Sequence, residues 1–396
     1  MTVLAAAVTA FQAGNLVKAE RLCRQGLTAE SDRADLLHLL GVIRHRSGNP
    51  LEAIPLIGRA IGLKDDNYKY HYNLGAALQA LGRHAQALDS YRAASALAPD
   101  IAAIYLATGQ LLQATGQNEE AEACLRIVLA QRPEDVAVLS ALGNVLQALG
   151  RLEDAEESYR SALDHQPDHV PTLVNLGSVL HAQGRLESAE TCHRRALAVQ
   201  ADFAPAHLNL GTVLQATGRI TDAVRSYRRA LELNPTDAGT HFSLGTAVQT
   251  VGWLEEAERC YRDALHLHPS HAEATNNLGH VLEARGALTA AAAVFQQACA
   301  LRPERADFHN NLAGCLYLLH RRDPEAARAE AARWLAAHPE QPIARHIAGA
   351  LSEQEAPQPP AEYVRTLFNC FAPGFDRGLL GIGYCGPALM ATAFGT

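Results

Sequence analysis

Glycine recurs every 34 residues through most of this 396-residue chain. A single globular core does not impose a fixed period on its sequence, whereas a stack of similar small helical hairpins does. In such a stack each hairpin packs on its neighbours, and function usually lies on a surface that several hairpins share. We therefore expect an all-α fold of repeated helix-turn-helix units. The eight glycines in register are Gly41, Gly75, Gly109, Gly143, Gly177, Gly211, Gly245 and Gly279.

Other columns keep the same period when Tyr68 is taken as position 1 of a repeat, which makes Gly75 position 8. Position 15 is glycine and position 20 is alanine in eight successive repeats, and position 32 is proline in six of them. Position 7 is mostly leucine, and position 24 carries a large ring in six repeats. Leucines at positions 7 and 11, such as Leu74 and Leu78, lie one turn apart and give the first helix an apolar face.

Each column has a physical reason. Glycine at position 15 ends the first helix, because it adopts the left-handed conformation without steric cost. Proline at position 32 follows the end of the second helix. Glycine at position 8 lies within a helix, where it costs about 0.5–1 kcal/mol relative to alanine. We expect close contact with a neighbouring helix to offset that cost, and the ring at position 24 to wedge between successive hairpins.

Composition excludes several classes of function. The net charge of −8, with acidic and basic residues interspersed, gives no basic surface for nucleic acid. The N-terminus lacks a basic signal region and no apolar stretch is long enough to span a membrane, so we expect a cytoplasmic protein. The eight cysteines form no CxxC pair, which predicts reduced thiols used in packing. His266 and His268 are two residues apart and point to different sides of the chain, so we expect no metal site and no cofactor.

The columns at positions 7, 8, 20, 24 and 32 resemble the tetratricopeptide repeat. The resemblance implies a right-handed α-solenoid superhelix of about ten repeats with a capping helix. Residues 34–305 fit eight regular repeats, residues 1–33 a degenerate first repeat, and residues 306–341 a tenth repeat with a two-residue insertion near His320. Residues 342–354 carry Ile343, Ile347 and Leu351 on one helical face, which suits a helix that caps the last hairpin.

In this family the first helix of each hairpin lines the concave face. Positions 6, 9 and 12 fall on one stripe of that helix and carry many amides. Such amides can bond to the N–H and C=O groups of an extended peptide, as the asparagine ladder does in O-linked N-acetylglucosamine transferases, which this stripe resembles. The predicted peptide-binding residues are Asn73, Asn175, Asn209, Asn277 and Asn311 at position 6, Asn144 at position 9, and Gln79, Gln113, Gln147, Gln215 and Gln249 at position 12. The alternative is that the stripe is a solvated helix face, with the asparagines bonding across to the next repeat.

Beyond a proline-rich linker at 355–362, residues 363–396 differ from the repeats and are rich in aromatic side chains. They resemble the entry segment of predicted S-adenosylmethionine-dependent methyltransferases that are fused behind tetratricopeptide repeats in bacteria. The matching positions are Phe368, Phe371, Phe375, Asp376, Tyr384 and Pro387. The cofactor-binding turn of that family would lie after Thr396, so the segment is expected to be the start of a truncated domain or a remnant. An unrelated docking tail that mediates self-association is the alternative.

The sequence therefore predicts a scaffold that binds extended segments of a protein or peptide partner, with no catalysis of its own. The alternative is the substrate-recruiting part of an enzyme, a methyltransferase before an O-linked glycosyltransferase. Basic residues are scarce on the polar stripe, which argues against a receptor for C-terminal carboxylates.

Overall fold

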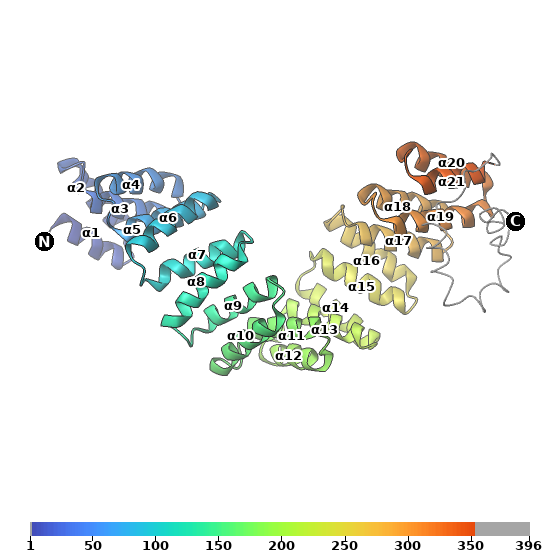
Figure 1. Ribbon diagram of the computed structural model, residues 1–396, viewed down its shortest axis with the longest axis horizontal. Helices are drawn as coiled ribbons and strands as arrows, with labels where there is room; N and C mark the ends of the chain where they lie inside the picture. Colours follow the sequence, from blue (N-terminus) through green and yellow to red (C-terminus); the bar gives the residue numbers. More distant parts are fainter. Residues whose placement is uncertain (1, 353–396) are drawn as a thin grey trace. The chain divides into compact units, whose positions relative to one another are not determined.

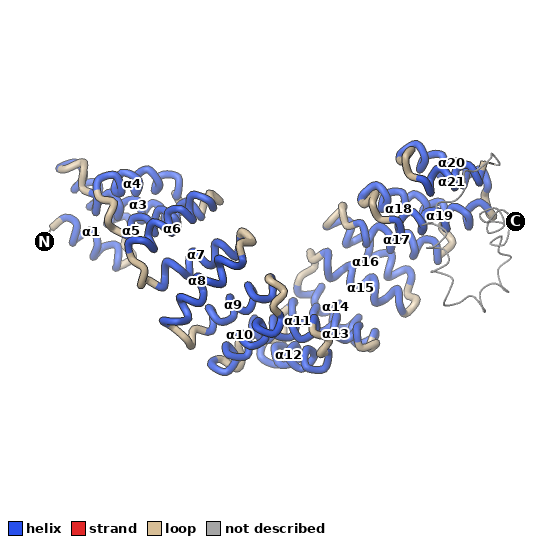
Figure 2. Tube along the Cα trace, viewed as in Figure 1, coloured by secondary structure: helices blue, strands red, loops and turns tan. Residues whose placement is uncertain are grey.

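The structure, a computed structural model, describes residues 2–352. Within this range it contains 21 α-helices and no strand (Figures 1 and 2). Successive helices pack in pairs, and each regular pair with its loops is one 34-residue repeat. The predicted all-α repeat fold is thereby confirmed. Short turns of about three residues join the two helices of a pair, which keeps sequence neighbours adjacent in space.

The chain forms two compact units, one through Gln200 and the other from Ala201, and each is described by itself. The helices of the first unit are α1 (Val3–Gln12), α2 (Leu16–Ala29), α3 (Ala34–Arg46), α4 (Pro50–Leu63), α5 (Tyr68–Gln79), α6 (His84–Leu97), α7 (Ala102–Ala114), α8 (Asn118–Gln131), α9 (Val136–Ala148), α10 (Leu152–His165), α11 (Val170–Ala182) and α12 (Leu186–Val199). Odd-numbered helices are the first of each hairpin and carry positions 1 to 13.

The second unit repeats this arrangement, and its described part continues past the last pair with one more helix. Its helices are α13 (Ala204–Ala216), α14 (Ile220–Leu233), α15 (Ala238–Thr250), α16 (Leu254–Leu267), α17 (Ala272–Ala284), α18 (Leu288–Leu301), α19 (Ala306–His320), α20 (Pro324–Ala337) and α21 (Pro342–Leu351).

Glycine at position 15 ends the first helix of each regular hairpin, as predicted. Gly150, for example, has a φ of 75°, in the left-handed region that only glycine enters without cost. The same conformation recurs at Gly14, Gly48, Gly82, Gly116, Gly184, Gly218, Gly252 and Gly286. The turn after each first helix is therefore set by one residue type at one position.

Glycine at position 8 allows the close helix contact that was expected to offset its low helix propensity. The contact is made by the ring at position 24 of the same hairpin. A Cβ atom added to Gly143 would lie 2.4 Å from the ring of Tyr159, and one added to Gly75 would lie 2.7 Å from the ring of Tyr91. Both pairs belong to a single hairpin. The rings therefore fill a space that the missing side chain opens between the two helices of their own hairpin, a contact that the expectation of a wedge between successive hairpins did not include.

Charged side chains connect successive repeats along the second helices. In the first unit Arg151 donates to Glu122 at 2.7 Å, and Arg185 donates to Glu156 at 2.7 Å. Burial pushes the pKa of Glu156 up, but hydrogen bonds from Arg185 and Gln183 and the charge of Arg160 bring it below the usual range. These ion pairs cross from one repeat to the next.

The last hairpin differs in length, and its insertion lengthens a helix instead of a loop. Helix α19 has 15 residues where the other regular first helices have 12 or 13, and the turn that follows keeps three residues. Helix α21 packs on α19 and α20, and it buries Ile343, Ile347 and Leu351. These three side chains cover apolar surface that the last hairpin would otherwise expose.

The cysteines of residues 2–352 are all free thiols. Cys260, which shares position 23 of the repeat with Cys124 and Cys192, is buried, and burial raises the pKa of its thiol to about 11. Burial also raises the pKa of Cys299 to about 12. These thiols stay protonated near neutral pH, as expected for packing residues.

Candidate functional site

The eleven predicted binding residues all lie on first helices of hairpins, and all are half-buried. We call this set, at positions 6, 9 and 12 of helices α5, α7, α9, α11, α13, α15, α17 and α19, the amide row. The spacing of three residues places these positions on one side of each helix. Half-burial means that each amide contacts protein on one side and is accessible on the other.

In the first unit, buried tyrosines at position 24 hold the glutamines at position 12. The hydroxyl of Tyr91 donates to Oε1 of Gln79 at 2.8 Å. The hydroxyl of Tyr159 donates to Oδ1 of Asn144 at 2.6 Å and to Oε1 of Gln147 at 3.2 Å. Burial raises the pKa of both tyrosines, so their hydroxyls remain protonated donors at any ordinary pH.

The position-6 asparagines of the first unit bond back to the repeats before them. The Nδ2 group of Asn73 donates to Nε2 of His38 at 2.8 Å. Burial lowers the pKa of His38 to about 4, so this ring is neutral and accepts. The Nδ2 group of Asn175 donates to Oδ1 of Asn144 at 2.7 Å. The alternative interpretation, in which these asparagines bond to a neighbouring repeat, therefore holds for their Nδ2 groups.

The second unit repeats both arrangements. Tyr227 donates to Gln215 at 2.9 Å and Tyr261 donates to Gln249 at 2.6 Å. The Nδ2 group of Asn277 reaches the Tyr261 hydroxyl at 3.4 Å, which forms a chain of three groups across two repeats. Such chains polarise and strengthen each bond in them.

Two further asparagines of the second unit lie in the same row. Asn311 donates through Nδ2 to Oδ1 of Asn276 at 2.9 Å. Asn276 is a buried residue of α17. Asn209 lies half-buried at position 6 of α13. Asn277 and Asn311 occupy position 6 in consecutive repeats.

The amide row is more continuous at position 12 than at position 6. In the first unit Gln79, Gln113 and Gln147 follow one another, whereas position 6 carries Ala107 and Ala141 between Asn73 and Asn175. Gln113 is the one glutamine of the row whose repeat has no tyrosine at position 24, since Leu125 stands there. Position 12 thus carries an amide in more consecutive repeats of the first unit than position 6 does.

The position-24 tyrosines are the part of the site that sequence reasoning missed. The sequence predicts only packing for these rings, whereas in the structure their hydroxyls also donate to amides of the row. The signal is present in the repeats: all four tyrosines at position 24 occur where position 12 is glutamine. Repeats with another residue at position 24 have His45, Gln113, His181 or Glu283 at position 12.

The first helices that carry the central part of the row contain no charged residue. In the first unit α7, α9 and α11 lack Asp, Glu, Lys and Arg, and in the second unit α13 and α15 lack them as well. The charges of these repeats lie on the second helices and in the turns, where many form ion pairs. On these five helices the amide row is therefore a neutral surface of amide, hydroxyl and small apolar groups.

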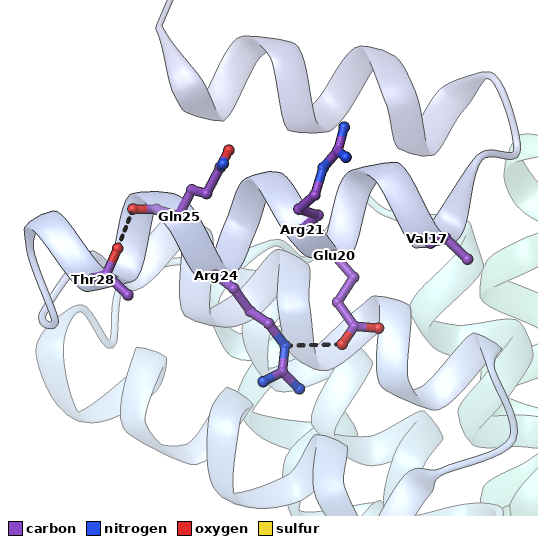
Figure 3. Close-up of a pocket in the computed structure, with 6 residues that line it drawn as sticks. All are labelled: Val17, Glu20, Arg21, Arg24, Gln25 and Thr28. Carbon is purple, nitrogen blue, oxygen red and sulfur yellow. Dashed lines mark hydrogen bonds and ion pairs between the residues drawn. The ribbon is translucent and has the colours of Figure 1, made fainter.

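A hollow of about 440 Å³ lies on α2 and is lined by Val17, Glu20, Arg21, Arg24, Gln25 and Thr28 (Figure 3). All six belong to one helix, the second of its hairpin, and the amide row is on first helices. Arg24 donates to Glu20 at 2.9 Å, and the hydroxyl of Thr28 donates to the carbonyl of Gln25 at 2.8 Å. Because one helix alone lines the hollow, it does not enclose a ligand.

Two other kinds of site find no support in the part of the chain that the structure describes. No cluster of three or more His, Cys, Asp or Glu side chains in residues 2–352 could hold a metal ion. No described helix combines the length and apolar character needed to cross a membrane. The linker at 355–362 and the tail at 363–396, with its methyltransferase resemblance, lie outside the described residues.

Paired helices with a 34-residue period, left-handed glycines at position 15 and a shared row on the first helices define an α-solenoid repeat protein. The chain belongs to the tetratricopeptide repeat family. Residues 1–244 match the family model described as the cilia and flagella-associated protein 70 C-terminal domain. Residues 242–306 and 295–342 match a tetratricopeptide repeat model. No curated protein matches the sequence.

Solved structures of the same fold include PilF of Pseudomonas aeruginosa, at 21% identity and a TM-score of 0.50. That likeness covers 54% of this chain and 97% of PilF. The C-terminal part of a tetratricopeptide repeat-containing protein from Cytophaga hutchinsonii matches at 14% identity and a TM-score of 0.52, over 61% of this chain and 99% of that one. At these identities the likeness establishes the fold. The fold is that of protein-interaction scaffolds in general, whose extended surfaces take protein or peptide partners.

Proposed function

We propose that this protein is an interaction scaffold whose amide row binds an extended peptide segment of a partner. The observation that carries the proposal is a neutral, half-buried row of amides that repeats from hairpin to hairpin. Amide side chains match the N–H and C=O groups of a peptide backbone, and every peptide residue other than proline offers both. Each such bond contributes about 0.5–1.5 kcal/mol, so several repeats together give moderate affinity after the ordering cost.

The neutrality of the row sets the physical character of this binding. Contacts between uncharged groups are not screened by salt, whereas attraction between charged surfaces weakens as the Debye length shortens. We expect peptide affinity to stay nearly constant between low and high ionic strength. A partner held by acidic or basic side chains would instead dissociate as salt is raised.

The test is an array of synthetic 15-residue peptides in three matched sets, neutral polar, acidic and basic, probed with the purified chain. Replacing Asn175, Asn209 and Asn277 together with alanine should weaken capture of neutral peptides about tenfold or more, since each lost bond is worth roughly a factor of 2–10. Circular dichroism should show unchanged helicity.

The matched control replaces three exposed amides that lie outside the row, Gln131, Gln200 and Asn234, with alanine. This variant should bind peptides like the unmodified chain. If no peptide set binds, or if the row variant binds as well as the control variant, the proposed surface is wrong.

The truncated-enzyme alternative rests on the resemblance of residues 363–396 alone. A coding frame that continues past Thr396 into a glycine-rich turn after a strand would make this scaffold the substrate-recruiting part of a methyltransferase. Sequencing the genomic DNA downstream of that codon tests it. A stop codon at that point would leave the scaffold as the whole protein.

A further inference from the structure

The amides of the row do not present both of their polar groups equally, and the internal hydrogen bonds decide which group each presents. At position 12, Oε1 of Gln79 and Oε1 of Gln147 accept from tyrosine hydroxyls, at 2.8 and 3.2 Å. A glutamine held through its oxygen offers the N–H groups of Nε2 to a ligand. Gln79 and Gln147 therefore present hydrogen-bond donors at position 12, whereas the repeat of Gln113 between them has Leu125 at position 24.

At position 6 the arrangement is reversed. Asn73 donates through Nδ2 to His38 at 2.8 Å, and Asn175 donates through Nδ2 to Asn144 at 2.7 Å. An asparagine engaged through its nitrogen offers Oδ1 to a ligand. Asn73 and Asn175 therefore present acceptors on the same side of the first helices, with Ala107 and Ala141 at position 6 of the two repeats between them.

The distance between positions 6 and 12 suits one extended peptide strand. Positions 6 and 12 are six residues apart, which is about 9 Å along a helix. An extended chain has hydrogen-bonding partners on both edges, each about 4.8 Å from it, so the partners lie about 9.6 Å apart. A peptide that crosses the first helices between positions 6 and 12 is therefore within reach of the side chains at both positions.

We infer that the amide row of the first unit reads peptide backbone with a fixed polarity. Carbonyl groups on one edge of the peptide accept from Gln79 and Gln147, and N–H groups on the other edge donate to Asn73 and Asn175. Tyr91 and Tyr159 act as positioning residues, because their hydroxyls fix which end of each glutamine faces the ligand. This inference rests on the proposed function and adds the partner's chemistry: a neutral, extended segment with free backbone N–H groups, and hence one poor in proline.

The charge distribution supports that partner class. Helices α7, α9 and α11 carry no charged side chain, and Lys69 is the one charged residue of α5. A charged ligand side chain would lose hydration at this surface without gaining an opposite charge there. Recognition of backbone groups therefore matches the surface better than recognition of charged side chains.

The experiment uses the full chain and a defined probe, an acetylated and amidated 15-residue peptide of Ser, Thr, Gly and Ala, with fluorescence anisotropy as the readout. The decisive variant is Gln79→Glu with Gln147→Glu. A carboxylate still accepts from the tyrosines, so packing is retained, but the donors are lost. We expect the affinity to fall at least tenfold. The variant Tyr91→Phe with Tyr159→Phe keeps both rings on their glycines and should lower affinity about three- to tenfold.

Tyr105→Phe on α7 is the matched control, because Tyr105 is a tyrosine at position 4, outside the row, and should leave affinity unchanged. The same probe with N-methyl groups on alternate residues should lose binding when the methylated edge faces position 6. If the unmodified probe binds the Glu variant as tightly as the unmodified chain, and N-methylation has no effect, the inferred arrangement of donors and acceptors is wrong. Failure of every neutral peptide to bind the unmodified chain would instead remove the proposed function itself.

Discussion

Tyr159 and His193 occupy position 24 of consecutive repeats and meet opposite hydrogen-bonding conditions. The Tyr159 hydroxyl has two acceptors on the amide row. His193 is fully buried, and neither of its ring nitrogens has a hydrogen-bond partner. Its ring still fills the space above Gly177, since a Cβ there would lie 2.4 Å from the imidazole. At this repeat the ring fills the space between the helices, but its nitrogens have no hydrogen-bond partner.

We therefore predict that His193→Phe stabilises the protein. Phe295 shows that a phenyl ring fits the same place, against Gly279. A buried unpaired polar group costs about 1–3 kcal/mol, so the free energy of unfolding should rise by about that amount. The urea midpoint with an unchanged slope measures the gain. A lower midpoint would mean that the imidazole has a partner in solution.

The same residue makes stability depend on pH. Burial lowers the pKa of His193 to about 4, from the ordinary 6.5. Between these two values the unfolded chain binds a proton and the folded chain does not, so stability falls as pH drops from about 6.5 to about 4. His193→Phe should remove this part of the pH dependence, and urea titrations at several pH values would show a flatter profile. An unchanged profile would assign the dependence to other histidines whose pKa burial lowers, His38 among them.

At the scale of the element, one missing side chain sets the approach of the two helices in a hairpin. Position 8 is glycine in every regular repeat, yet the reason differs among them. In the repeat of Gly143 an added Cβ would lie 2.4 Å from the ring of Tyr159. In the repeat of Gly109, where position 24 is Leu125, the nearest atoms would lie 3.3–3.4 Å away.

These distances predict different costs for the same substitution. Gly143→Ala should lower the free energy of unfolding by about 1–3 kcal/mol, because the buried ring has no room to move. Gly109→Ala should change it by less than about 1 kcal/mol, because the helix gains propensity while Leu125 shifts slightly. Thermal unfolding of both variants measures the contrast. Equal effects would show that the ring does not fix the helix spacing.

The elements themselves were predictable, and the role of the ring was not. Turn glycines, helix-ending prolines and the leucine face follow local rules that each repeat obeys independently. The place of the Tyr91 ring depends on how the two helices of a hairpin face each other, which periodicity does not specify. Its bond to Gln79 joins residues on two different helices and needed the tertiary structure.

At the scale of the whole molecule, charge and neutrality are separated between the two helices of a hairpin. Second helices and turns carry ion pairs that cross between repeats, such as Arg185 with Glu156, while central first helices stay neutral. Stability in a repeat array depends on the contacts between neighbouring repeats as much as on each repeat alone. These ion pairs therefore contribute to the cohesion of the array, and the neutral helices are those that carry the proposed binding surface.

The contribution of the ion pairs between repeats can be measured at Glu156. Although burial raises its pKa, the bonds from Arg185 and Gln183 bring the pKa below the ordinary value of 4.5. The stabilisation is complete above about pH 5 and is lost as pH falls through the lowered pKa. Glu156→Gln should therefore lower the urea midpoint at pH 7, and the difference from the unmodified chain should shrink at pH 3. Peptide affinity should be unaffected, since Glu156 lies outside the amide row.

The sequence by itself determined the family, the helices, their turns and the side of the first helices on which the amides fall. All of these follow from a period of 34 residues and from the local preferences of glycine, proline and leucine. Only the tertiary structure decided which end of each amide is engaged. For Asn144 and Gln147 that choice depends on the hydroxyl of Tyr159, which reaches them when their hairpin closes. Asn175 of the next repeat reaches Asn144 only when the hairpins stack. Periodicity places side chains on a face, and packing assigns their hydrogen bonds.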